Sequence, residues 1–174
     1  VHQPLAPTGS YHPLTLASLF FLFSILGWIL ETLSYLTMEG VFLNRSILLG
    51  PWIPLYGICG VLSVTMLHRF AKNPILAFCM NGLLYSVIGY LSDFTVQMIW
   101  HADLHKISQY FCPSLLPPFF ADAMFLGLIG CACQYFIAPK WKQITRKIPL
   151  WFLLCVCVLL GMLMLLDVFF AFYR

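Results

Sequence analysis

Two carboxylates lie deep inside apolar stretches that are each long enough to cross a lipid bilayer. Glu31 falls within residues 14–38, and Asp93 falls within residues 74–100. A charged group at the centre of a membrane helix costs about 2.5–3.5 kcal/mol on insertion scales, so it needs a partner, a water-filled cavity or a task. The two acids therefore predict a polar site inside a membrane domain.

Small and polar residues recur at helical spacing around both acids. Small residues let membrane helices approach closely, and polar residues can form hydrogen bonds between them. One interpretation is a polar cavity in which Glu31 and Asp93 face each other. The other is a packing seam in which each acid is protonated or paired with Arg45. The two stripes are Ser24, Gly27, Trp28, Glu31 and Tyr35, and Gly82, Ser86, Gly89, Asp93 and Gln97.

The composition places lipid around much of the surface. The chain of 174 residues is 61% hydrophobic and 9% charged, whereas a soluble domain carries about 25% charged residues. In a chain of this length too large a share of the residues lies at the surface for a bigger core to explain the low charged fraction. We expect a segment at 1–13 and one transmembrane domain at 14–174. The net charge of +3 and the absence of a long basic run argue against a nucleic-acid partner.

The predicted fold is all-α, a polytopic bundle of about five membrane helices. About 20 apolar residues are needed to cross the hydrocarbon core. The connection after the first helix is itself apolar and ends in Gly50-Pro51, so we expect a re-entrant segment at 40–52. The five predicted helices cover residues 14–38, 53–70, 74–100, 118–138 and 149–172.

The distribution of Lys and Arg predicts the orientation. Cytoplasmic loops are enriched in these residues. The loops after the second and fourth predicted helices carry six of them, and the opposite side carries three. We therefore predict a protein of the cell membrane with its N-terminus in the cytoplasm and its C-terminus outside. The six are Arg69, Lys72, Lys140, Lys142, Arg146 and Lys147, and the three are Arg45, Lys106 and Arg174.

This orientation places the acids at similar depths. Glu31 lies 17 residues past the start of the first helix, or about 26 Å at 1.5 Å per residue. Similar counting puts Asp93, Asp122 and Asp167 in the outer half of the membrane, although the last two could simply face the interface. Arg45 lies in the connection above them, and we expect it to reach down to Glu31.

Few other residues suggest chemistry. His101 and His105 are four residues apart, but no third ligand lies nearby, so we predict no metal site and no cofactor. No catalytic or nucleotide-binding signature is present in the sequence, and an ATPase would have to be a separate chain. The basic run 140–147 reads most simply as an anchor at the lipid headgroups, and alternatively as a docking surface for a cytoplasmic partner.

The stretch from Phe20 to Gly60 carries a specific pattern of residues. They are Gly27-Trp28, Glu31, Glu39-Gly40, Phe42, Asn44-Arg45, Gly50-Pro51, Pro54 and Tyr56-Gly57. With this pattern the stretch resembles a family of small bacterial membrane proteins described as ABC-transporter permeases of type IV. The resemblance departs from the family pattern at Ser46, where the family has glycine, and in the absence of a Trp-Asp-Tyr-Ser motif between the third and fourth helices.

The resemblance implies a transport-related membrane subunit, permease-like or substrate-binding, with a polar site toward the outer face. Its partners would be the bilayer, a separate ATPase or other membrane subunit, or a second copy of the chain. Two alternatives stay open: a membrane enzyme acting on a lipid or isoprenoid with Glu31 or Asp93 as acid or base, and a non-catalytic assembly partner. The predicted substrate or ion site comprises Glu31, Asp93, Arg45, Asn44, Trp28 and Tyr56.

Overall fold

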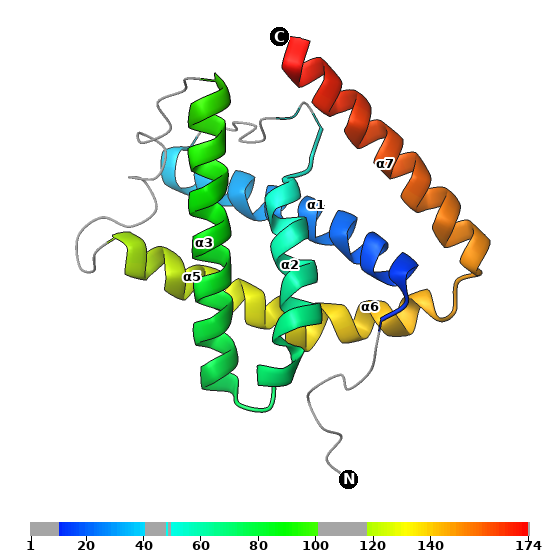
Figure 1. Ribbon diagram of the computed structural model, residues 1–174, viewed down its shortest axis with the longest axis horizontal. Helices are drawn as coiled ribbons and strands as arrows, with labels where there is room; N and C mark the ends of the chain where they lie inside the picture. The colour runs from blue at the N-terminus through cyan, green and yellow to red at the C-terminus, as the bar shows by residue number, and fades with distance from the viewer. Residues whose placement is uncertain (1–10, 41–47, 49, 101–117, 174) are drawn as a thin grey trace. The chain divides into compact units, whose positions relative to one another are not determined.

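The computed structural model describes residues 11–40, 48, 50–100 and 118–173 (Figure 1). Within these ranges, the side chains at 35, 38–39, 92–100, 118–122 and 172–173 are not described. The described backbone is helical with short turns and contains no strand, which confirms the predicted all-α fold. The α-helices are α1 (Pro13–Glu39), α2 (Pro54–Met66), α3 (Pro74–Trp100), α5 (Pro118–Ala132), α6 (Ala138–Thr145) and α7 (Leu150–Tyr173).

Among the described residues, four helical segments are long and apolar enough to cross a membrane. This confirms the prediction of a multi-pass membrane protein. The segments are Pro13–Ser34, Pro74–Leu91, Ala123–Thr145 and Leu150–Ala171.

The second predicted helix, 53–70, is shorter as an α-helix than the sequence suggested. Helix α2 has 13 residues and continues as a four-residue 3₁₀ turn, η1 (Leu67–Phe70). Thirteen residues extend about 20 Å at 1.5 Å per residue, less than the hydrocarbon core of about 30 Å. Whether α2 crosses decides the side of the C-terminus, so the predicted orientation stays a prediction.

The chain forms two compact units, which are described separately. Unit 1 contains Leu62–Pro139, and unit 2 contains Ser10–Val61 with Lys140–Arg174. The boundaries fall within α2 and near the start of α6, so each of these helices contributes to both units.

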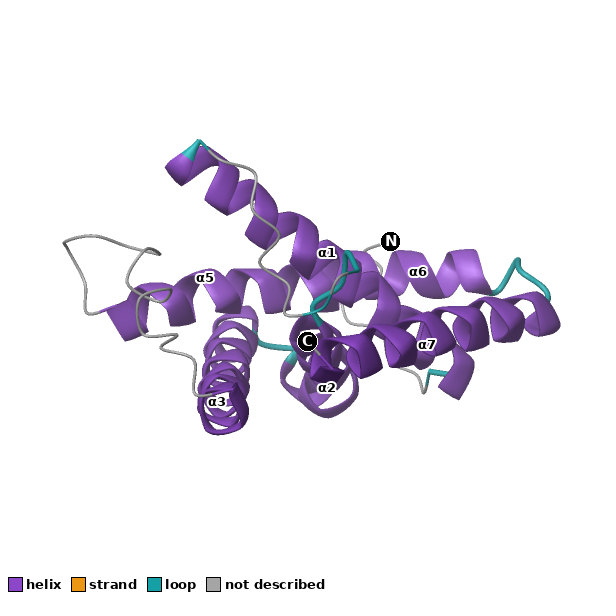
Figure 2. Cartoon of the chain, turned by 90° about the horizontal axis from the view of Figure 1, so that it is seen from above, coloured by secondary structure: helices purple, strands orange, loops and turns teal. Residues whose placement is uncertain are grey.

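In unit 1, α3 and α5 cross each other (Figures 1 and 2), and both helices carry small residues where they meet. A Cβ atom on Gly82 would lie 2.7 Å from the Ala123 carbonyl oxygen, and one on Gly127 would lie 3.0 Å from the Phe78 carbonyl oxygen. Glycine at these positions therefore lets the two backbones touch, as is common between membrane helices.

The fourth predicted helix was expected to end at 138, but it continues to Thr145. Proline lacks the N–H of a helical bond, and its ring clashes with the carbonyl four residues earlier. A π-helical turn, η2 (Cys133–Ile137), precedes Pro139, and the Ala138 N–H donates to the Cys133 carbonyl five residues back. Such a turn widens the helix locally, which lets α6 follow α5 through the proline.

The π turn also brings polar side chains into the interior of unit 1. The Gln134 amide donates to the Leu67 carbonyl at 3.1 Å, and its oxygen accepts from Asn81 at 3.1 Å. The Asn81 oxygen accepts from the Ser63 hydroxyl at 2.5 Å. Because Leu67 begins η1, directly after α2, Gln134 ties the π turn to the end of α2.

In unit 2, the first half of α2 packs on α1 through glycines. A Cβ atom on Gly57 would overlap the Ser24 hydroxyl, and one on Gly60 would overlap the Phe23 ring. Gly27 of α1 is the reciprocal case, because a Cβ atom there would overlap the Tyr56 ring. The two helices therefore approach more closely than larger residues would allow.

We predict that Gly27→Ala destabilises the protein, because the added methyl group overlaps the Tyr56 ring and forced overpacking costs about 1–3 kcal/mol. Gly89→Ala is the matched control, since a Cβ atom at Gly89 has no neighbour within 4 Å. Thermal unfolding of the purified protein in detergent measures both. Equal transition temperatures for the two variants would show that α2 does not contact Gly27.

Candidate intramembrane acid site

The connection into α2 is attached to α7 by a buried carboxylate. The Gly50 backbone N–H donates to Asp167 Oδ2 at 2.7 Å, and the Trp52 indole Nε1–H donates to the same oxygen at 2.9 Å. Asp167 is only 7% exposed, and Trp52 is 8% exposed. Asp167 therefore fixes the position of residues 50–52 beside α7.

The same connection is attached to α1 through backbone atoms. The Ile53 N–H donates to the Ser24 carbonyl at 3.0 Å. Pro54 then begins α2, and a proline at the first helical position loses nothing because its missing N–H would have had no helical acceptor. The chain therefore enters α2 directly on the surface of α1.

Glu31 of α1 is held by Tyr56, which lies in the first turn of α2. The Tyr56 hydroxyl donates to Glu31 Oε1 at 2.8 Å, and Tyr56 is buried. Gly27 and Glu31 are four residues apart and share one face of α1. The ring of Tyr56 lies on the bare backbone of Gly27, so its hydroxyl reaches the carboxylate of Glu31.

One short segment thus joins two acids from different helices. Gly50, Trp52 and Tyr56 supply the three donors, and Glu31 and Asp167 supply the acceptors. We call these five residues the acid site. Each acid makes further interactions beyond these bonds.

The predicted site residues are only partly brought together. Tyr56 and Glu31 form the hydrogen bond just described. Trp28 lies on α1 three residues before Glu31 and is half-buried. The side chain of Asp93, in α3, and the whole of Arg45 and Asn44 lie outside the described residues. The expected Glu31–Asp93 and Glu31–Arg45 pairs therefore stay predictions.

Asp167 was not included in the predicted site. Its place near the end of the last helix suggested an acid at the membrane interface, but the structure buries it against Gly50 and Trp52. Its partners lie more than 100 residues away in the sequence. One signal in the sequence could have indicated such a partner. The apolar connection before α2 contains Trp52, and the indole N–H of a tryptophan inside a membrane needs an acceptor.

The described residues contain no cluster of three or more His, Cys, Asp or Glu side chains suited to a metal ion. The chemistry of the acid site is that of oxygen acceptors. Carboxylates accept hydrogen bonds and attract cations, and tyrosine can donate or accept.

A family model described as "Putative ABC-transporter type IV" matches residues 18–172. The chain belongs to this family. The match includes every residue of the acid site and confirms the resemblance seen at Phe20–Gly60. No curated protein and no solved structure matches the chain. Together with the apolar helices, the family supports a transport-related, multi-pass membrane protein.

We predict that Trp52→Phe destabilises the protein, because it removes the indole donor while keeping a buried aromatic ring. Hydrogen bonds to charged groups contribute about 1.5–3 kcal/mol. Trp151→Phe is the control, since Trp151 is 69% exposed. Thermal unfolding in detergent compares the two variants.

A double-mutant cycle then tests the partner. If Trp52 acts through Asp167, the effects of Trp52→Phe and Asp167→Asn are not additive. Additive effects would mean that the indole and the carboxylate act independently.

Proposed function

We propose that this chain is the membrane-embedded, substrate-binding subunit of a transport system. Its binding site would be the acid site together with Trp28, and with Asn44, Arg45 and Asp93 as further candidates. The observation that supports this most is that one segment, Gly50–Tyr56, carries donors to two carboxylates on two different helices. A separate ATPase subunit would supply the energy.

The substrate class follows from the donor and acceptor inventory. Ionised carboxylates only accept hydrogen bonds, so a bound species must offer a positive charge or several N–H or O–H groups. We propose an inorganic cation, a protonated amine or a polyhydroxylated molecule. Such a species would compete with Tyr56 for Glu31 and with Trp52 for Asp167.

Competition of this kind would couple binding to movement. The three donors tie the start of α2 to α1 and α7. Releasing the donors would therefore loosen the start of α2. This gives the permease-like role a physical mechanism, in which the substrate replaces internal hydrogen bonds and frees one helix.

A ligand that binds only the folded protein raises its apparent stability as its concentration increases. We predict that at least one member of a panel of alkali and divalent cations, amines and sugars raises the transition temperature of the wild-type protein. Glu31→Gln should abolish that increase, because the neutral amide no longer attracts the ligand. Tyr90→Phe is the control, since Tyr90 is an exposed tyrosine and should leave the increase unchanged.

A ligand that stabilises Glu31→Gln as strongly as wild type would contradict the proposed site. Purification from native membranes through a tag on this chain tests the subunit role separately. Recovery of a nucleotide-hydrolysing subunit supports it. Recovery of a bound lipid beside Glu31 without such a subunit would favour the membrane enzyme, and recovery of an unrelated membrane protein would favour an assembly partner.

A further inference from the structure

A dense group of cations covers the end of the third candidate membrane segment and the turn that leads to the fourth. Residues 140–147, here called the basic turn, contain two lysines close together and then Arg146-Lys147, with no acidic residue. The preceding segment ends at Thr145, and the next begins at Leu150. Where two successive segments cross the bilayer, the turn between them lies at a membrane surface, and both of these segments are long enough to cross.

The basic turn is held in place by contacts within unit 2. The Trp141 indole donates to the Ser18 hydroxyl at 2.9 Å. The Lys142 ammonium lies 4.5 Å from the centroid of the Tyr11 ring, within the range of a cation–π interaction. Burial raises the pKa of the Tyr11 phenol, so the ring stays neutral beside the ammonium. Lys142 is therefore positioned before any ligand arrives.

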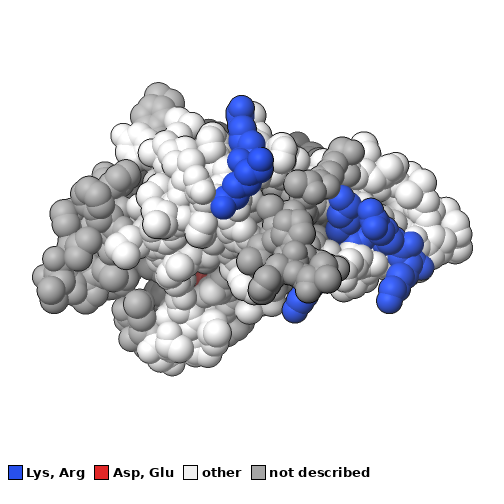
Figure 3. Space-filling model, turned by 90° about the horizontal axis from the view of Figure 1, so that it is seen from below, with Lys and Arg blue, Asp and Glu red and all other residues white. Residues whose placement is uncertain are grey.

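The backbone also stays ordered beyond the end of α6. The Arg146 N–H donates to the Lys142 carbonyl at 3.3 Å, and the Lys147 N–H donates to the Ile144 carbonyl at 3.0 Å. Lys142 and Arg146 are four residues apart and share one face of this turn. Figure 3 shows a contiguous patch of Lys and Arg side chains with no acidic side chain within it.

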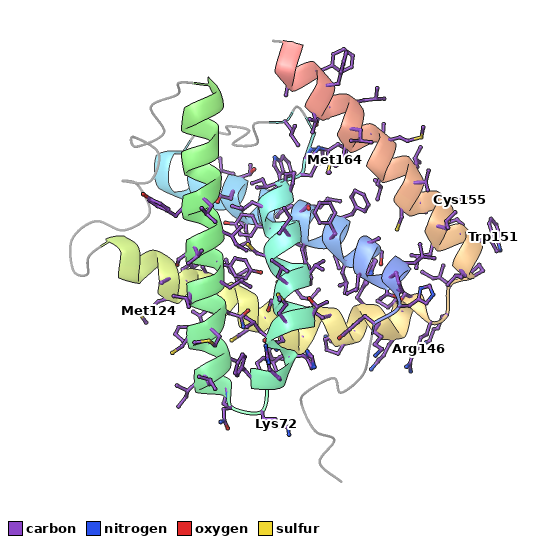
Figure 4. All side chains as sticks on the ribbon, in the orientation of Figure 1. Lys72, Met124, Arg146, Trp151, Cys155 and Met164 are labelled. Atoms are coloured by element: carbon purple, nitrogen blue, oxygen red, sulfur yellow. The ribbon has the colours of Figure 1, made fainter. Side chains whose placement is uncertain are left out.

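Large apolar side chains adjoin these cations. Leu150, Trp151 and Phe152 begin α7 and are all exposed. Arg146 and Trp151 flank the turn between α6 and α7 and point outward (Figure 4). The surface therefore changes from cationic to apolar within a few residues.

We propose that the basic turn binds the headgroup phosphate of anionic phospholipids, whose acyl chains lie along Leu150–Phe152. A phospholipid offers a negative headgroup joined to apolar chains, which matches both halves of this surface. An acidic soluble protein would match the cations alone. Basic clusters at membrane surfaces attract anionic lipids in general, and here one lysine is fixed by Tyr11.

The test compares two matched double variants of the full chain in detergent. Arg146→Gln with Lys147→Gln alters the basic turn, and Arg69→Gln with Lys72→Gln alters the other basic loop. Each pair replaces one exposed arginine and one exposed lysine. Phosphatidylglycerol and phosphatidylcholine are titrated separately, and the rise in transition temperature is measured. Circular dichroism verifies that each variant is folded.

We expect phosphatidylglycerol to stabilise the wild type at a concentration at least tenfold lower than phosphatidylcholine. The Arg146/Lys147 variant should need about tenfold more phosphatidylglycerol, whereas the Arg69/Lys72 variant should behave as wild type. Soluble glycerol phosphate should not compete, because it lacks the acyl chains.

Four results would overturn the proposal. Equal responses to both lipids would exclude selection by charge, and equal losses in both variants would show an effect of net charge alone. Full competition by glycerol phosphate would indicate a site for free phosphate. Loss of an acidic protein partner from the Arg146/Lys147 variant, with its lipid response unchanged, would assign the basic turn to protein docking.

Discussion

The arrangement of unit 2 depends on a buried carboxylate that needs donors and a buried connection that needs acceptors. Asp167 lies on an apolar helix where water is scarce, and an unsatisfied polar group in such surroundings costs several kcal/mol. The Gly50 amide and the Trp52 indole are hydrogen-bond donors, and they would carry the same cost without an acceptor. Each side satisfies the other, and that fixes where the chain enters α2.

Once residues 50–52 are attached to α7, the next contacts follow from short-range geometry. Ile53 reaches the Ser24 carbonyl, Pro54 starts the helix, and Tyr56 arrives over Gly27 within reach of Glu31. Gly27 thus has a physical explanation, since it provides room for the Tyr56 ring, whose hydroxyl donates to Glu31. The two acids are therefore structural anchors as well as the basis of the proposed site.

The sequence was sufficient to predict much of the fold. Apolar runs gave the all-α membrane class and the limits of α3 at Pro74–Trp100, because twenty or more apolar residues between prolines or polar turns leave few alternatives. The length of α2 and the end of the helix at Pro139 were less predictable. A π turn accommodates that proline in a continuous helix, and the local composition does not indicate such a turn.

The candidate site was predictable only where its residues shared a local pattern. Glu31 was identified because it is an acid in an apolar run, and Tyr56 because of the family resemblance, but their pairing needed the close contact at Gly27. Asp167 was left out of the predicted site because its donors are remote in sequence. Hydrogen bonds across more than 100 residues depend on how helices pack, which periodicity does not reveal.

The most direct test of this account is the NMR signal of the Trp52 indole proton in the detergent-solubilised protein. It is assigned by its loss in Trp52→Phe, and hydrogen exchange is followed in wild type and in Asp167→Leu. A proton bonded to a buried carboxylate should exchange slowly in the wild type and rapidly in the variant. If it exchanges in the wild type as fast as the exposed Trp151 indole, or is unaffected by Asp167→Leu, Asp167 does not anchor the connection and the account is wrong.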